Sequence, residues 1–101
     1  MDKSKILQGL FFCHLTIEKL LKAHFVRANE ALAPKTHDLI YLMKKANLSL
    51  DEAQKTTLLT LMNYQLEGRY PDNFISSPGK EKAAEYMNQT KELLEWLMQR
   101  L

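Results

Sequence analysis

Near the start of the chain, three residues carry side chains that could take part in chemistry: His14, Glu18 and Lys22. They are spaced four apart, so on an α-helix they share one face, one turn after another. Glu18 precedes Lys22, which is the favourable order for an ion pair along a helix. His14 and Glu18 could both touch one metal ion, but two ligands make a poor site and no further ligand motif is present. We therefore expect a surface pair beside an interface, and no metal or cofactor.

The other potential catalysts have simpler explanations. His24 falls on an apolar stripe, where a hydrogen-bonded core histidine is the usual role. The other members of this stripe are Leu10, Cys13, Ile17, Leu20, Leu21 and Ala28. His37 follows Thr36, a candidate helix N-cap, and is expected to serve local structure. Cys13 is the only cysteine in the chain and is expected to be a small buried hydrophobe. The sequence also has no glycine-rich phosphate loop, no Ser-His-Asp order and no clustered carboxylates, so nothing in it demonstrates an enzyme.

A second group of residues could recognise a phosphate. The cations of the first helical segment are Lys19, Lys22 and Arg27, and Arg69 follows later among the aromatic residues Tyr64, Tyr70 and Phe74. Arginine beside aromatic rings is a reasonable way to hold a phosphate and stack a base. The alternative is structural: Arg69 pairs with Asp72 or Glu18, and Tyr70 closes the end of a bundle.

Helical patterns account for nearly the whole chain. Apolar residues recur at three- and four-residue spacing, which predicts helices over about 3–32, 36–47, 49–68 and 77–101. Expected boundary signals are a Thr36 N-cap, a left-handed Asn47 and a capping box from Ser49 to Glu52. The connection 69–79 is long for a compact bundle. The sequence thus predicts a single domain over 1–101, an all-α antiparallel up-and-down bundle of about four helices.

The composition sets the class of protein. The chain has 101 residues, 46% hydrophobic and 26% charged, which is ordinary for a soluble domain. No apolar run is long enough to span a membrane, no secretion signal is visible, and a single cysteine suits a reducing compartment, so we expect a cytoplasmic protein. The first fifty residues carry eight Lys/Arg against four Asp/Glu, and the rest six against eight. This asymmetry, +4 against −2, is mild and gives no strong nucleic-acid signal.

Three motifs in order give the chain a family resemblance. Residues 12–23 read Phe-Cys-His-Leu-Thr-Ile-Glu-Lys-Leu-Leu-Lys-Ala, residues 36–39 read Thr-His-Asp-Leu, and residues 69–72 read Arg-Tyr-Pro-Asp. This order resembles the HEPN domain. The resemblance implies a helical bundle that pairs as a homodimer, is often encoded beside or fused to a small nucleotidyltransferase, and is linked to nucleotide binding. Relatives usually carry another helix before the first motif, so the resemblance also implies that this helix is missing.

Many members of the family are ribonucleases, whose motif is Arg, four to six residues, then His. That spacing is absent here: nine residues separate Arg27 from His37, and neither Arg69 nor Arg100 has a histidine after it. Arginine cannot replace a histidine that transfers protons near neutral pH. We therefore expect a non-catalytic module that binds a nucleotide, a small nucleotidyltransferase partner, or both. The alternatives are an RNA-cleaving toxin component of a toxin–antitoxin pair with an atypical site, and a purely structural interaction adaptor.

Two sets of site residues follow from these expectations. The expected nucleotide or phosphate site comprises Glu18, Lys19, Lys22, Arg69, Tyr70 and Asp72. The first helical segment is apolar over a wide arc, more than three other helices can cover, and an uncovered apolar patch marks an association site. The expected homodimer interface comprises Leu7, Phe11, His14 and Leu15.

Overall fold

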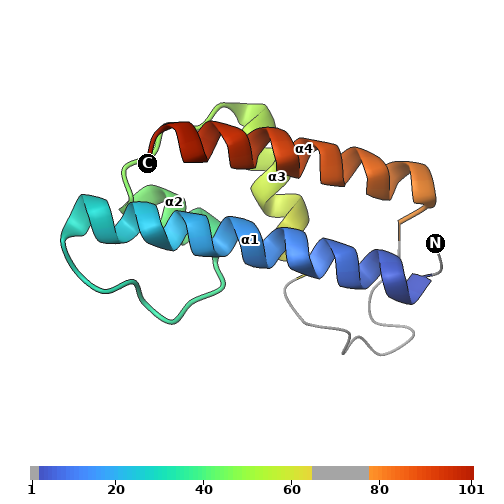
Figure 1. The fold of residues 1–101 in the computed structure, drawn as a ribbon, viewed down its shortest axis with the longest axis horizontal. Coiled ribbons are helices and arrows are strands. Elements are labelled where there is room, and N and C mark those ends of the chain that lie inside the picture. The colour runs from blue at the N-terminus through green and yellow to red at the C-terminus, as the bar shows by residue number, and fades with distance from the viewer. Residues whose placement is uncertain (1–2, 65–77) are drawn as a thin grey trace.

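The computed structural model of this chain describes residues 3–64 and 78–101. Within them lie four helices and no strand (Figure 1), and they are α1 (Lys3–Asn29), α2 (Leu39–Lys45), α3 (Glu52–Met62) and α4 (Lys80–Gln99). The expected all-α bundle with two long and two shorter helices is confirmed. None of the described helices is long and apolar enough to cross a membrane. The expected site residues Arg69, Tyr70 and Asp72 lie outside the described residues.

The directions of the helices differ from the expected up-and-down order. The long helices α1 and α4 run side by side in the same direction (Figure 1). At one end Gly9 of α1 lies against Met87 of α4, and at the other His24 of α1 is hydrogen-bonded to the Leu97 carbonyl, 2.8 Å away. Helix α3 runs the opposite way, since its start lies by Trp96 and its end by the start of α4.

The order arises in the segment 30–38, which brings the chain back along α1 before α2 begins. Helix α1 ends three residues earlier than expected, because Glu30 has a φ of 50° and leaves the helical conformation. Returning from Asn29 to the level of Glu18 covers about 17 Å at about 1.5 Å per residue. The eight residues to His37 can span about 28 Å when extended, so the return fits. Helix α2 then runs in the direction of α1, and Asn29 donates a hydrogen bond to the Lys45 carbonyl, 2.8 Å away, where the two helices end.

The core consists of two clusters along the length of α1. The larger one joins all four helices and contains Ile17, Leu21, Leu39, Leu42, Met43, Leu50, Leu58, Leu61, Leu93 and Leu97. The smaller one lies at the start of α1 and contains Ile6, Leu7, Leu10, Tyr64 and Ala83. The predicted apolar stripe on α1 is confirmed at Leu10, Ile17, Leu21 and His24, which are all buried. It is wrong at Ala28, which is exposed near the end of the helix.

Local hydrogen bonds set the starts of α2 and α3 two residues later than predicted. Asp38, rather than Thr36, is the N-cap of α2, and its carboxylate accepts from the Tyr41 backbone N–H at 3.0 Å. Thr36 instead accepts from the Asp38 backbone N–H. The capping box of α3 joins Asp51 and Gln54 rather than Ser49 and Glu52. Both alternatives satisfy the capping rules, so the sequence alone does not choose between them.

Of the other boundary predictions, the one at Asn47 is confirmed and the start of the last helix is shifted. Asn47 is left-handed, with a φ of 58°, as predicted. Helix α3 ends at Met62, and its expected stop at Gly68 lies outside the described residues. Helix α4 begins at Lys80 with Gly79 as its N-cap, slightly later than the expected start at Ser77 or Pro78.

Candidate functional site

A buried carboxylate, Glu18, is the centre of a polar cluster where α1 meets the segment leading into α2. Its side chain is only 6% exposed, and three other side chains lie close to its carboxylate. His37 Nδ1 donates to Glu18 Oε1 at 2.8 Å, and Lys22 Nζ lies 3.1 Å from Oε2. His14 Nδ1 is farther, at 3.6 Å from Oε1. Both carboxylate oxygens therefore have a charged or polar partner, as a buried carboxylate requires.

The other ring nitrogen of His14 links α1 to the segment that carries His37. Its Nε2 donates to the backbone carbonyl of His37 at 3.1 Å, because a carbonyl can only accept. The neutral ring then carries its proton on Nε2, and the bare Nδ1 faces Glu18. His14 is only 1% exposed, so it is an interior residue rather than the expected surface residue beside an interface. His37 is thus held twice, by its carbonyl and by its ring.

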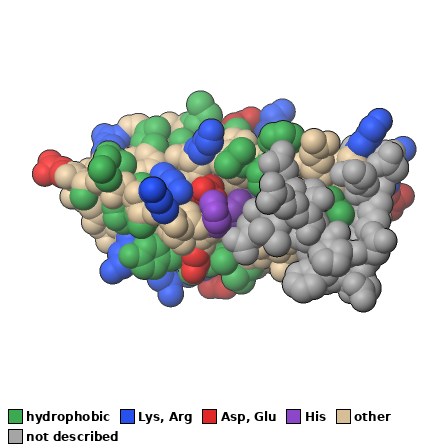
Figure 2. All heavy atoms as spheres, turned by 90° about the horizontal axis from the view of Figure 1, so that it is seen from below, with side chains coloured by type: hydrophobic (Ala, Val, Ile, Leu, Met, Phe, Trp, Pro, Cys, Tyr) green, Lys and Arg blue, Asp and Glu red, His purple; other side chains and the backbone are tan. Residues whose placement is uncertain are grey.

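Lys22 and His37 present this cluster to solvent. The His37 side chain is 64% exposed and that of Lys22 is 26% exposed. Figure 2 shows histidine side chains on the surface beside acidic and basic ones. Because Nδ1 of His37 donates to Glu18, Nε2 carries the free lone pair and has no partner among the described residues. The site therefore offers an ammonium group with spare donors and an oriented imidazole nitrogen, which suits phosphate or hydroxyl recognition.

The electrostatic environment keeps Glu18 charged and His14 neutral. Burial raises the pKa of the Glu18 carboxyl, but the hydrogen bonds from His37 and Lys22 outweigh it, so that pKa lies below its ordinary value. Burial lowers the pKa of the His14 imidazole by more than the His37 carbonyl and the Glu18 charge raise it. Cys13 is half-buried rather than buried as expected, and its partial burial raises the pKa of its thiol.

Lys19 and Lys22, both expected at the phosphate site, lie in different surroundings. Lys22 pairs with Glu18, whereas Lys19 lines an apolar groove between α1 and α4. A step of one residue turns about 100° around a helix, which places Lys19 on the α4 side of Glu18. Lys19 therefore lies away from the Glu18 cluster.

The residues expected at a homodimer interface also divide. Leu7 is 7% exposed and, like His14, is covered within its own chain. Phe11 and Leu15 are partly exposed, and Phe12, which sequence reasoning left out, is 50% exposed. Phe12 also borders the apolar surface between α1 and α4, which continues through Leu20, Leu94 and Met98. The apolar surface open to a partner is therefore shifted toward α4.

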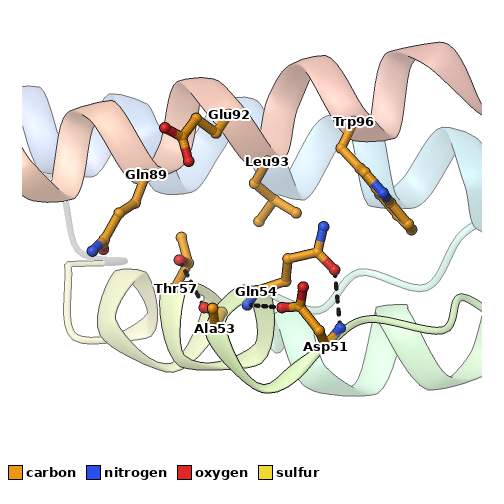
Figure 3. Close-up of a pocket in the computed structure, with 8 residues that line it drawn as sticks. All are labelled: Asp51, Ala53, Gln54, Thr57, Gln89, Glu92, Leu93 and Trp96. Atoms are coloured by element: carbon orange, nitrogen blue, oxygen red, sulfur yellow. Dashed lines mark hydrogen bonds between the residues drawn. The ribbon is translucent and has the colours of Figure 1, made fainter.

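Sequence reasoning missed a cavity of about 430 Å³ between α3 and α4 (Figure 3). Its lining residues are Asp51, Ala53, Gln54, Thr57, Gln89, Glu92, Leu93 and Trp96. On α4 they recur at three- and four-residue spacing, which places them on one face of the helix. That spacing was readable in the sequence. Only the packing of α3 against that face shows that a cavity forms there.

Among the described residues, no group of three His, Cys, Asp or Glu side chains is arranged so that it could hold a metal ion. Arg27, one of the cations of the first helical segment, is also placed away from the Glu18 cluster. It lies at the far end of α1, where its guanidinium is 3.5 Å from the Arg100 carbonyl. His24 is a hydrogen-bonded core residue, as predicted, through its contact with Leu97.

Comparison with known families gives one match. The model of the HEPN domain matches residues 3–101, nearly the whole chain. No curated protein and no solved structure gives a significant match.

Replacing Glu18 with Gln should destabilise the fold by about 1–3 kcal/mol at neutral pH, since the bonds from His37 and Lys22 lose their charged acceptor. The folded-state pKa of Glu18 lies below its ordinary value, so its contribution is present above about pH 4.5 and lost as the pH falls through the folded value. The pKa of His14 is also lowered, so its protonation should weaken the fold from about pH 6.5 downward.

Urea unfolding of the wild type and Glu18→Gln from about pH 8 to about pH 2.5 would measure this. The difference between the two proteins should shrink below about pH 4.5. Glu95→Gln, at an exposed position of α4, is the matched control and should change little. A difference for Glu18→Gln that stays constant across the pH range would contradict the assignment.

Proposed function

Because the chain belongs to the HEPN domain family, we propose that it is a homodimeric, non-catalytic module that binds a nucleotide or a small nucleotidyltransferase partner in the cytoplasm. One observation carries the binding part of this proposal. Buried Glu18 fixes the Lys22 ammonium and the His37 ring side by side at the surface, 3.1 Å and 2.8 Å from its two oxygens. Glu18 is then a positioning residue rather than a ligand contact, because a carboxylate repels phosphate.

Lys22 would supply most of the attraction for a phosphate. Its Nζ has three donors, and one of them is directed at Glu18. The Nε2 of His37 would accept from a ribose hydroxyl, or donate to phosphate when the ring is protonated. The charge of Glu18 offsets that of Lys22, so the site has little net charge and its affinity for nucleotides should be modest. Arg69, Tyr70 and Asp72 remain the sequence-based candidates for the rest of the site.

Replacing Lys22 with Gln should weaken binding of nucleoside triphosphates about five- to tenfold, because a charge-assisted contact to phosphate is lost while a donor to Glu18 remains. Calorimetry with ATP, GTP, CTP and UTP would measure it, and binding should weaken as salt rises. Lys44→Gln, at an exposed position of α2 outside the Glu18 cluster, is the charge-matched control. Equal affinities for both variants would remove Lys22 from the site.

One feature favours a second candidate function, the RNA-cleaving toxin component with an atypical site. A histidine whose Nδ1–H is held by a carboxylate, with Nε2 open to solvent, has the geometry of a general base. His37 meets that description although the family's Arg-to-His spacing is absent. The leading proposal still predicts no cleavage, because the Arg-to-His spacing of the family's ribonucleases is absent from the sequence.

Incubating the purified protein with single-stranded RNA tests this directly, with intact RNA as the expected result. A copurifying nuclease would act equally in preparations of His37→Ala and Lys44→Ala. Cleavage that is abolished by His37→Ala and retained by Lys44→Ala would replace the non-catalytic proposal with the ribonuclease one.

The homodimer is proposed to form along the partly exposed side of α1 and the neighbouring α4. The wild type should sediment as a dimer at micromolar concentration, and Phe12→Glu should shift it toward monomer by placing a charge on an apolar surface. Leu59→Glu introduces the same charge at a 57% exposed position on α3 and should leave the dimer intact. A monomeric wild type would contradict the proposal, and it would leave the adaptor hypothesis as the use for this surface.

A further inference from the structure

The cavity between α3 and α4 is large enough for a ligand and lies apart from the Glu18 cluster. Its volume of about 430 Å³ falls in the range of small-molecule sites. Leu93 forms an apolar floor, and polar groups approach from both helices (Figure 3). None of the residues that line this cavity belongs to the Glu18 cluster, so a ligand here would bind independently of the proposed phosphate site.

The charges of the cavity select a cation. Two of its described lining residues are acidic, Asp51 on the α3 side and Glu92 on α4, and none is Lys or Arg. The Glu92 carboxylate has no partner among the described residues. Asp51 uses Oδ1 to accept from the Gln54 backbone N–H at 2.7 Å, which leaves Oδ2 for a ligand. A phosphate would be repelled here, so this cavity is not a second nucleotide site.

The aromatic wall selects a flat cation. Trp96 lines the cavity, and its indole already has a guanidinium on it: Cζ of Arg100 lies 3.7 Å from the ring centroid. Arg100 lies one turn beyond Trp96, whereas Glu92 and Leu93 lie about one turn before it. A ligand in the cavity would therefore meet the indole from the other side. Guanidinium stacks on tryptophan and pairs with carboxylates through its planar fork, and an ammonium group does only the second well.

Gln54 adds a donor that distinguishes a peptide from a simple cation. Its side-chain oxygen accepts from the Asp51 backbone N–H at 3.0 Å, which fixes the amide orientation. The amide nitrogen is then directed into the cavity (Figure 3) and has no partner among the described residues. A donor there is useless to a bare cation but matches the carbonyl oxygen of a peptide backbone.

From these four features, we propose that the α3–α4 cavity binds an arginine side chain presented by a peptide segment of a protein partner. The guanidinium stacks on Trp96 and pairs with Asp51, Glu92 adds negative charge on the α4 side of the cavity, and the backbone carbonyl of the same segment accepts from Gln54. Binding is electrostatic at an open site, so it weakens as salt rises.

Trp96 is the only tryptophan of the chain, so its fluorescence reports on this cavity directly. The probe is the capped tripeptide Gly-Arg-Gly, compared with the same tripeptide carrying lysine or citrulline, the uncharged isostere of arginine. The arginine peptide should bind saturably, and the citrulline peptide at least about tenfold more weakly, because charge-assisted hydrogen bonds are lost. Equal binding of the arginine and citrulline peptides, or no saturable binding of the arginine peptide, would overturn the proposal.

Two further measurements test where the guanidinium binds and whether a peptide must carry it. Glu92→Gln should weaken the arginine peptide about fivefold, while the control Glu95→Gln, one residue outside the cavity lining, should not. Equal effects of the two variants would show general charge attraction and overturn the site. Agmatine, a guanidinium without a peptide carbonyl, should bind more weakly than the peptide. Agmatine binding as well as the peptide would overturn the peptide partner in favour of a free cation.

Discussion

The burial of the Glu18 carboxylate is the constraint from which the arrangement of this domain follows. A carboxylate that is 6% exposed needs partners for both oxygens, and one of them, His37, comes from outside its own helix. Satisfying it brings the segment 30–38 back along α1 and fixes where α2 starts. His14 reinforces the same return through the His37 carbonyl. Helix α2 then runs in the direction of α1, and α3, which packs against α1, α2 and α4, runs in the opposite direction.

The side chains that stabilise the fold around Glu18 are the same ones that would form the proposed phosphate site. The hydrogen bonds that satisfy Glu18 are also the ones that orient the Lys22 ammonium and the His37 ring toward solvent. A group that must be held for the fold is pre-organised for a ligand at no further cost in side-chain entropy. The cluster therefore differs from an ordinary solvated helix face, where Lys22 would be free to adopt many rotamers.

The described residues present three chemically different surfaces. The corner of α1 and the following segment carries Lys22 and His37, the side between α1 and α4 is apolar around Phe12 and Met98, and the cavity between α3 and α4 is acidic. Each suits a different class of partner: a phosphate, an apolar protein surface and a cationic peptide. The three surfaces lie on different parts of the domain, so one domain could engage more than one partner at a time.

The pattern of the sequence alone predicts the buried face of α1, several side-chain roles on it, and the family. The three- and four-residue spacing of Leu10, Ile17 and Leu21 predicts the buried face of α1, because any helix with that spacing must turn those side chains the same way. The Glu18–Lys22 pair and the core role of His24 follow from the same geometry. The family was recognisable because its motifs are short, ordered and local.

The tertiary structure decided what depends on contacts between distant residues. Spacing along α1 cannot show that His37 would reach Glu18 from nineteen positions away, or that His14 would be interior rather than at a surface. Nor can it choose between Thr36 and Asp38 as a cap, since both side chains can accept the same kind of bond. The shared direction of α1 and α4 and the cavity beside Trp96 likewise arise only when helices pack. Local spacing fixes which side of a helix a residue occupies, but the path of the connecting chain fixes what that side meets.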